Sequence, residues 1–165
     1  FSNVRECATG TFHEPEPGMR YWAGLDLAKV EDYTVLTIMD KDRRVCFMDR
    51  FNRLDWGTLV ARISGTVSRY KATLYVDSTG VGDPIYEELR KWNFDTKPYP
   101  FTARSKADLI HALVIALEQR VVEIPTPELA PELIDELEAF EYSVTDQGNV
   151  RMSAPGSQHD DCVMS

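Results

Sequence analysis

The chain has 165 residues, the usual size of a single domain, of which 43% are apolar and 27% charged. This composition excludes a disordered chain, a collagen-like repeat and a disulfide-stapled scaffold, and no apolar run approaches the ~18 residues of a membrane helix. The net charge of -9 by itself argues against a nucleic-acid partner. The charge is uneven, however, because residues 41–71 carry eight basic and three acidic side chains, whereas residues 123–146 carry eight acidic and no basic ones.

The three cysteines, Cys7, Cys46 and Cys162, are widely spaced and form no CxxC pair. This spacing favours neither a zinc site nor a disulfide framework. We therefore expect three buried or idle thiols in a reducing compartment.

The first half of the chain predicts three strands and a helix. Residues 1–19 start without Met and look like a linker or a lead-in strand that follows a cut point. Apolar runs rich in strand formers cover residues 21–27, 33–40 and 44–51, and a short turn-rich gap makes the last two antiparallel neighbours. Asp55 is a suitable N-cap for a helix. Its expected inner face consists of Trp56, Leu59, Val60, Ile63, Val67 and Tyr70.

A buried strand and a second helix follow. Residues 73–77 form the strand, and Asp83 and Pro84 are expected to open the helix. Its expected apolar stripe consists of Ile85, Leu89 and Trp92. Residues 97–101 contain two prolines, which would either confine a strand there to the edge of a sheet or break it.

The last third of the chain predicts two helices, a hairpin and the start of a further helix. Ser105 is expected to open a helix to about residue 120, and Thr126 with Pro127 a fourth one, on which Leu129 should be buried. Residues 140–152 are typical of a hairpin that turns at residues 146–149. The order of elements predicts an α/β fold, in which three antiparallel strands and then parallel strands form a central mixed sheet with helices on both faces.

Four acidic residues stand where chemistry is usually placed. Asp26 interrupts an apolar strand, Asp77 closes another, and Asp160 and Asp161 precede the last expected helix. A carboxylate in a buried strand is costly unless it is paired or binds a metal. Ion pairs, turn formation and helix capping are the structural alternatives. Taken together, the four acids favour clustered hard oxygen ligands, which suit Mg²⁺ or Mn²⁺.

These acids lie in motifs that resemble a known family. The motifs are GLDLAKVEDY (24–33), VDSTGVGDP (76–84), SKADL (105–109) and HDD (159–161). In order and spacing they resemble the C-terminal nuclease domain of the terminase large subunit of tailed bacteriophages, which has a ribonuclease H-like fold. The resemblance implies that residues 20–165 form this domain and that residues 1–19 are a linker remnant from a preceding ATPase domain.

The resemblance also implies a site with two Mg²⁺ or Mn²⁺ ions. Asp26 and Asp77 would hold them together with Asp161 as the direct ligand and Asp160 as a second ligand or an outer partner. Asp32 is a further candidate ligand, with a hairpin-turn role as the alternative. Basic side chains that could contact DNA phosphates are Lys29, Arg43, Arg44, Arg53 and Lys106.

The implied function is a metal-dependent DNA endonuclease. It would cut concatemeric viral double-stranded DNA when genome packaging starts and stops, in the host cytoplasm at the procapsid. The implied partners are an ATPase domain, the portal protein and the small terminase subunit, without a membrane. The chain lacks GxxxxGK[ST], so no ATP-driven step is assigned to it. A resolvase-like junction endonuclease and a non-catalytic DNA-gripping module are the alternatives.

Overall fold

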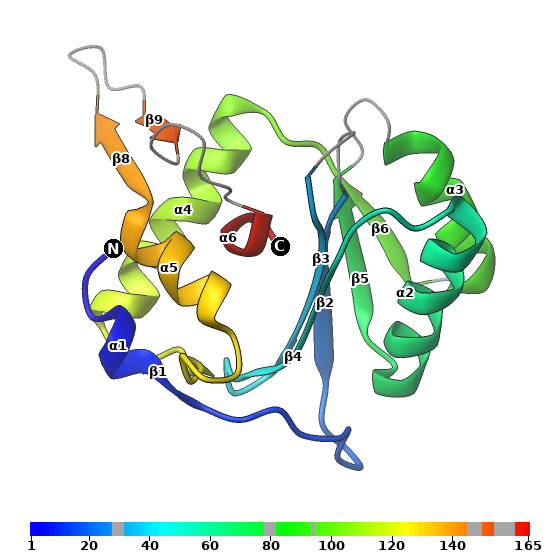
Figure 1. The fold of residues 1–165 in the computed structure, drawn as a ribbon, viewed down its shortest axis with the longest axis horizontal. Helices are drawn as coiled ribbons and strands as arrows, with labels where there is room; N and C mark the ends of the chain where they lie inside the picture. The colour runs from blue at the N-terminus through cyan, green and yellow to red at the C-terminus, as the bar shows by residue number, and fades with distance from the viewer. Residues whose placement is uncertain (28–31, 78–81, 94, 145–149, 154–160) are drawn as a thin grey trace.

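The centre of the molecule is a five-stranded mixed sheet in the order β4-β3-β2-β5-β6 (Figure 1). The computed structural model describes residues 1–27, 32–77, 82–93, 95–144, 150–153 and 161–165. The strands are β2 (Tyr21–Asp26), β3 (Thr34–Asp40), β4 (Val45–Phe51), β5 (Thr73–Asp77) and β6 (Thr96–Tyr99). The first three are antiparallel, and β5 and β6 run parallel to β2. This confirms the predicted α/β fold, including the edge position of the proline-containing strand β6.

Two helices cover one face of the sheet, α2 (Trp56–Tyr70) and α3 (Gly82–Trp92). Asp55 caps α2 as predicted, since its Oδ1 accepts the N–H of Thr58 at 3.0 Å. The core beneath them includes Ile63, Val67 and Leu89. Period-3.6 apolar positions on α2 and period-2 positions on the strands meet in this layer, which explains why the local patterns predicted it well.

The prediction that Trp56 and Trp92 lie on the buried faces of their helices is wrong. Trp56 is 59% exposed and Trp92 is 70% exposed. Trp56 is the first residue of α2 and Trp92 the last residue of α3. Residues at the ends of a helix can continue its apolar stripe in sequence and still project past the sheet that the middle of the helix covers.

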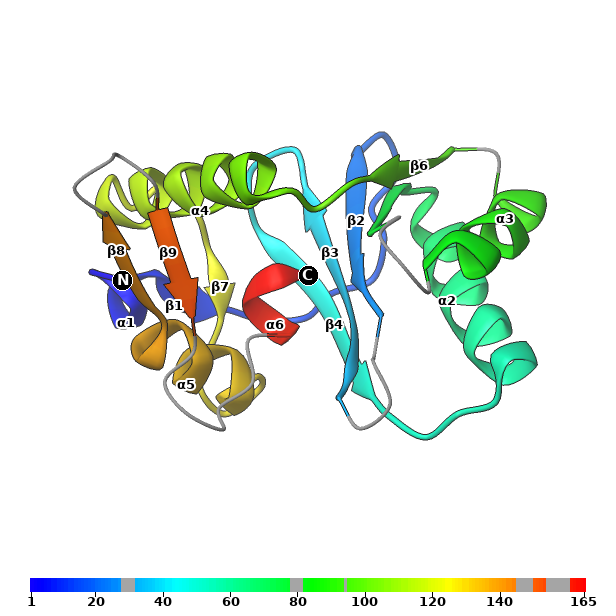
Figure 2. The same ribbon diagram turned by 90° about the horizontal axis from the view of Figure 1, so that it is seen from above.

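The other face is covered by a second group of elements. These are α1 (Val4–Cys7), α4 (Ala103–Glu118), α5 (Pro131–Ala139), α6 (Asp161–Met164) and the short parallel strands β1 (Ala8–Gly10) and β7 (Ile124–Pro125). A separate core lies here and includes Val35 from the sheet with Leu117, Ile134 and Leu137 from the helices. Seen from above, α6 lies between the sheet and the group of α1 and α5 (Figure 2). Residues 4–10 are therefore packed elements, and a connection to a preceding domain stays a prediction.

Three predicted helix starts differ from the structure. Helix α4 begins at Ala103, because Thr102 is its N-cap and Ser105 is the third residue of the reciprocal capping box. Helix α5 begins at Pro131, which leaves Leu129 exposed in the preceding turn. Helix α3 begins at Gly82, so that Asp83 lies within its first turn. Several nearby Ser, Thr, Asp and Pro residues satisfy the same start rules, and packing selects among them.

The hairpin is confirmed as β8 (Glu141–Val144) and β9 (Val150–Ser153), which are antiparallel. Its predicted turn at residues 146–149 lies outside the described residues. Cys7, Cys46 and Cys162 are buried free thiols, as predicted. Among the described residues, no helix combines the length and the apolar character needed to cross a membrane.

Candidate metal centre at the carboxyl edge of the sheet

Two of the predicted acids end neighbouring parallel strands. Asp26 is the last residue of β2, and Asp77 is the last residue of β5. The register pairs Leu25 with Val76, and each acid follows one residue later. Since residues in register on parallel strands project to the same face, both half-buried carboxylates belong to the same edge and face of the sheet.

Gly24 shows which face this is. Side chains alternate along a strand, so residues 24 and 26 face the same way. A Cβ placed on Gly24 would collide with the backbone carbonyl of Ser165, directly after α6. Asp26 therefore projects toward the layer that contains α6, and only glycine allows the backbone after α6 to approach β2 this closely.

The third acid comes from α6 itself. Asp161 is the first residue of α6 and is only 9% exposed. Its Oδ2 accepts the backbone N–H of Tyr33 at 3.3 Å, which ties α6 to the start of β3. The fold thus brings Asp26, Asp77 and Asp161 into one layer, although 135 positions of sequence separate the first from the last.

Glu136 anchors α6, a role that the sequence analysis missed. Its Oε2 accepts the backbone N–H groups of Cys162 at 2.7 Å and Val163 at 3.2 Å. Burial raises the pKa of Glu136, and these two hydrogen bonds oppose the rise. A signal was present, because Glu136 stands between Leu133 and Leu137 on the apolar stripe of its helix, where a charge is costly unless it has partners.

An arginine adjoins the same region. In the register, Asp26 pairs with Val35, and Val35 pairs with Arg50 on β4. The guanidinium carbon of Arg50 lies 3.4 Å from the centre of the Tyr33 ring. The Nε atom of Arg50 is buried and has no hydrogen-bond partner among the described residues. A positive charge therefore lies on the face that carries the acids.

Two further predicted ligands, Asp32 and Asp160, and the predicted DNA-contacting residue Lys29 belong to the same stretches of sequence. Asp32 is half-buried, just before Tyr33, whose N–H contacts Asp161. Asp160 and Lys29 lie outside the described residues. The choice between Asp160 and Asp161 as the direct ligand therefore stays a prediction.

The predicted DNA-contacting residues lie at two ends of the sheet. Arg43 and Arg44 lie in the turn after β3, and the distance along that strand from the Asp26 level to this turn is about 17 Å. Arg44 is also paired there, with its Nε 2.8 Å from Oδ2 of Asp40.

The other two basic residues lie at the acidic end. Arg53 follows β4, whose last residue, Phe51, pairs with Thr34. Lys106 lies in the first turn of α4, shortly after β6, whose Tyr99 pairs with Asp77. Arg53 and Lys106 therefore lie toward the same end of the sheet as Asp26 and Asp77, and Arg43 and Arg44 lie toward the other end.

A different cluster meets simple metal-ligand spacing. Among the described residues, three donor atoms that all lie within 4.8 Å of one another come from His13, Asp40 and Cys46. Asp40 already accepts the N–H groups of Asp42 and Arg44, and the Cys46 thiol donates to the carbonyl oxygen of Arg44 at 3.2 Å. Burial raises the pKa of Cys46 to about 12, which opposes a thiolate. These bonds close the turn between β3 and β4 without a metal.

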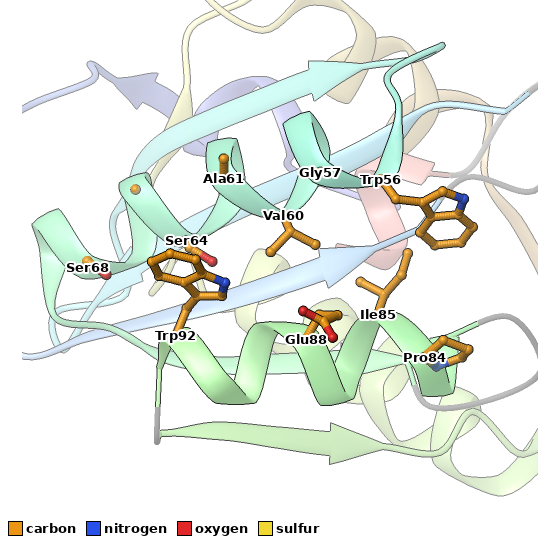
Figure 3. Close-up of a pocket in the computed structure, with 11 residues that line it drawn as sticks. Trp56, Gly57, Val60, Ala61, Ser64, Ser68, Pro84, Ile85, Glu88 and Trp92 are labelled. Atoms are coloured by element: carbon orange, nitrogen blue, oxygen red, sulfur yellow. The ribbon is translucent and has the colours of Figure 1, made fainter.

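A groove of about 700 Å³ lies between α2 and α3, on the opposite face of the sheet (Figure 3). Trp56 and Trp92 lie toward its two ends, and Val60 and Ile85 project between the helices. Glu88, the one charged side chain that lines it among the described residues, is paired with Lys91 at 2.7 Å. The groove is therefore separate from the candidate metal centre, because Asp26, Asp77 and Asp161 do not line it and it lies on the other face of the sheet.

Comparison with known proteins decides the family. The family model described as "Terminase RNaseH-like domain" matches residues 23–165. The chain belongs to this family. The terminase domain is 36% identical over 152 residues to the large terminase subunit of Thermus phage G20c. The aligned region covers 90% of this chain and 31% of that protein. It thus spans about a third of the length of this curated relative.

Solved structures agree with this assignment. The large terminase nuclease from thermophilic phage G20c superposes on the terminase domain with a TM-score of 0.86 and 31% identity, over 100% of this chain and 93% of that chain. The same nuclease with bound magnesium also gives a TM-score of 0.86 at 31% identity, with 92% of that chain covered. The predicted family and the predicted ribonuclease H-like fold are both confirmed.

Proposed function

We propose that this terminase domain is a metal-dependent endonuclease that cuts concatemeric viral double-stranded DNA at the start and end of packaging. The observation that carries the proposal is the juxtaposition of Asp26 and Asp77 on adjacent parallel strands with Asp161 on the helix packed against them. The related G20c nuclease, which has been solved with bound magnesium, supports a divalent metal here.

The donor set fits such a metal. All three described side chains offer carboxylate oxygens, the ligands that Mg²⁺ and Mn²⁺ prefer. With Asp32 and Asp160 as further ligands, such a set of carboxylates would hold two ions about 3.5–4 Å apart.

The chain's own groups would prepare the reaction. Bound divalent ions supply a water nucleophile at neutral pH and stabilise the leaving oxygen of the phosphodiester. Asp26 and Asp77 hold their carboxylates at the end of a rigid sheet, and the N–H of Tyr33 orients the Asp161 carboxylate. Arg53 and Lys106 would contact the phosphates of the bound strand; their position toward the end of the sheet that carries Asp26 and Asp77 supports this role.

The proposal places the domain in a larger packaging machine. A preceding ATPase domain, the portal protein and the small terminase subunit would be its partners, at the procapsid in the host cytoplasm. The 31% coverage of the G20c large subunit leaves room for such a domain in the relative.

The test is cleavage of plasmid and linear duplex DNA by Asp26→Asn and Asp77→Asn in Mn²⁺. We expect both variants to lose cutting and to keep their circular dichroism spectrum, because each change removes one charge from a strand end without changing its size. Near-wild-type cutting by Asp26→Asn would overturn the site. Preferential cutting of four-way junctions would support a resolvase-like enzyme instead, and folded wild-type protein that binds DNA without Mn²⁺-dependent cutting would support a gripping module.

A further inference from the structure

The N-terminal end of α6 (Asp161–Met164) needs partners outside the helix. The first N–H groups of a helix have no acceptor within it. Contacts with other elements must therefore set the direction of Asp161. The described hydrogen bonds from other elements come from Glu136 on α5, from Thr37 on β3 and from Tyr33, just before β3.

The contact from α5 acts directly on the backbone of Asp161. The Cys162 nitrogen belongs to the peptide unit that joins Asp161 to Cys162, and it donates to Oε2 of Glu136 at 2.7 Å. The same oxygen accepts the N–H of Val163 at 3.2 Å. One oxygen atom thus satisfies two otherwise unpaired N–H groups and fixes the peptide plane next to the Asp161 Cα.

The contact from the sheet acts on the side chain of Asp161. The Tyr33 N–H donates to Oδ2, and the Arg50 guanidinium is stacked on the Tyr33 ring. Asp161 is therefore held at its backbone by Glu136 and at its carboxylate by Tyr33.

We propose that Glu136 is a positioning residue for the metal centre. It does not touch an ion, but it sets the rotation of Asp161 by holding the adjacent peptide unit, so that the Asp161 carboxylate reaches the metal. The inference rests on the metal-dependent function proposed above. Glu136 is 9% exposed on the apolar side of α5, where its desolvation is compensated by the two N–H groups of α6. Partners that orient metal ligands in this way typically change metal affinity by about 10–100-fold when they are removed.

Two conservative substitutions separate position from charge. Glu136→Gln keeps an amide oxygen at the place of Oε2 and removes the charge. Glu136→Asp keeps the charge and withdraws the carboxylate by about 1.5 Å, the length of one C–C bond. The matched controls are Glu132→Gln and Glu132→Asp, since Glu132 is an exposed glutamate on the same helix.

The measurement is Mn²⁺ affinity by isothermal titration calorimetry, together with the unfolding midpoint in EDTA. We expect Glu136→Asp to weaken Mn²⁺ binding about tenfold or more, and Glu136→Gln to stay within about threefold of wild type. Both Glu132 variants should bind as wild type does. The amide protons of Cys162 and Val163 should exchange faster in Glu136→Asp than in Glu136→Gln, because only the aspartate loses the acceptor position.

The opposite order of the two Glu136 variants would overturn the proposal in favour of a purely electrostatic role. Wild-type Mn²⁺ affinity in both Glu136 variants would overturn it, because Glu136 would then have no role in metal binding. A Glu136→Asp variant that is unfolded in EDTA would also overturn it, because the role of Glu136 would then be purely structural. The metal-dependent function proposed above would fail if the wild-type domain bound no Mn²⁺, and the positioning role of Glu136 would then fail with it. That function would fail on its own if Asp26→Asn bound Mn²⁺ as tightly as the wild type does.

Discussion

Asp161 differs from the other two described acids in its surroundings. It is nearly buried and accepts a backbone N–H, whereas Asp26 and Asp77 are half-buried at strand ends. A side chain with a fixed hydrogen bond has fewer accessible rotamers, so less order must be gained when it binds a metal. Its neighbour Asp160 carries the same carboxylate group.

We therefore expect Asp161→Asn to lose more cleavage than Asp160→Asn. Loss of an outer partner costs about 10–100-fold, and loss of a direct ligand should exceed that. The measurement is the single-turnover rate of both variants on linear duplex in Mn²⁺. An active Asp161→Asn variant beside an inactive Asp160→Asn variant would reverse the assignment of the direct ligand.

The cysteines give a second prediction for single residues. Burial raises the pKa of the Cys46 and Cys162 thiols, and it also raises that of Cys7. A buried thiol that stays protonated is a poor nucleophile. We expect no reaction with Ellman's reagent at pH 8 in the native protein and three reactive thiols in denaturant. Rapid native labelling would contradict the burial of these residues.

Two elements owe their positions to single residues. Helix α2 begins where Asp55 accepts the Thr58 N–H at 3.0 Å and the Thr58 hydroxyl at 2.7 Å. The end of α6 packs against β2 only because Gly24 has no side chain. One element is thus placed by a polar cap and the other by a missing methyl group.

The Asp55 cap predicts a pH-dependent contribution to stability. The Thr58 N–H lowers the pKa of Asp55, so the folded state favours the carboxylate. A lowered folded-state pKa means that the stabilisation is complete above the unfolded pKa of about 3.9 and is lost as the pH falls below it. Asp55→Ala should therefore lower the urea midpoint at pH 7 and have less effect at pH 3. An equal loss at both pH values would assign the effect to something other than the ionised cap.

Gly24→Ala predicts a local displacement of α6. The added methyl group would meet the backbone of Ser165, which cannot move aside as a flexible side chain does. We expect a loss of about 1–3 kcal/mol in the free energy of unfolding, typical of overpacking, and weaker Mn²⁺ binding because Asp161 moves with its helix. Gly65→Ala is the matched control, since a Cβ there meets no atom within 4 Å. Unchanged Mn²⁺ affinity in Gly24→Ala would mean that the position of α6 does not affect metal binding.

At the scale of the whole molecule, charge determines how DNA can approach. The net charge of -9 repels a polyanion at long range, and this repulsion is strongest at low salt. Arg53 and Lys106, the basic residues at the same end of the sheet as the acids, follow its two edge strands, β4 and β6. Contacts with phosphates position a duplex without reading its sequence. We therefore expect the isolated domain to bind DNA weakly and to cut with little sequence preference.

Reversal of these two charges tests that arrangement. Arg53→Glu and Lys106→Glu should each slow cleavage and reduce the salt slope of duplex binding by about one. Arg43→Glu is the control, because Arg43 is exposed and lies at the far end of the sheet. Equal effects of all three substitutions would mean that the duplex covers both ends. Tight, sequence-selective binding by the unmodified domain would contradict the expected weak contact.

The sequence by itself determined the central sheet and the helix α2. Alternating apolar residues and turn-rich gaps predict β2, β3 and β4 correctly, and Asp55 marks the start of α2, because these features depend on neighbours within a few residues. It also singled out Asp26 within a strand and Asp77 at a strand end, since an acid in an apolar run is visible without knowledge of the fold. The structure ends β2 at Asp26. The family resemblance then linked them with Asp161.

Only the tertiary structure decided which of these residues meet. Parallel pairing of β2 with β5 sets Asp26 beside Asp77, and no local pattern contains that register. The Glu136 contact to α6 spans 26 positions, and the same glutamate in isolation is one charge on an apolar stripe. Arg43 and Arg53 look equivalent in the sequence and are separated by the length of β4. The physical reason is that local propensity sets the period of each element, whereas burial and long-range hydrogen bonds choose the faces that come together.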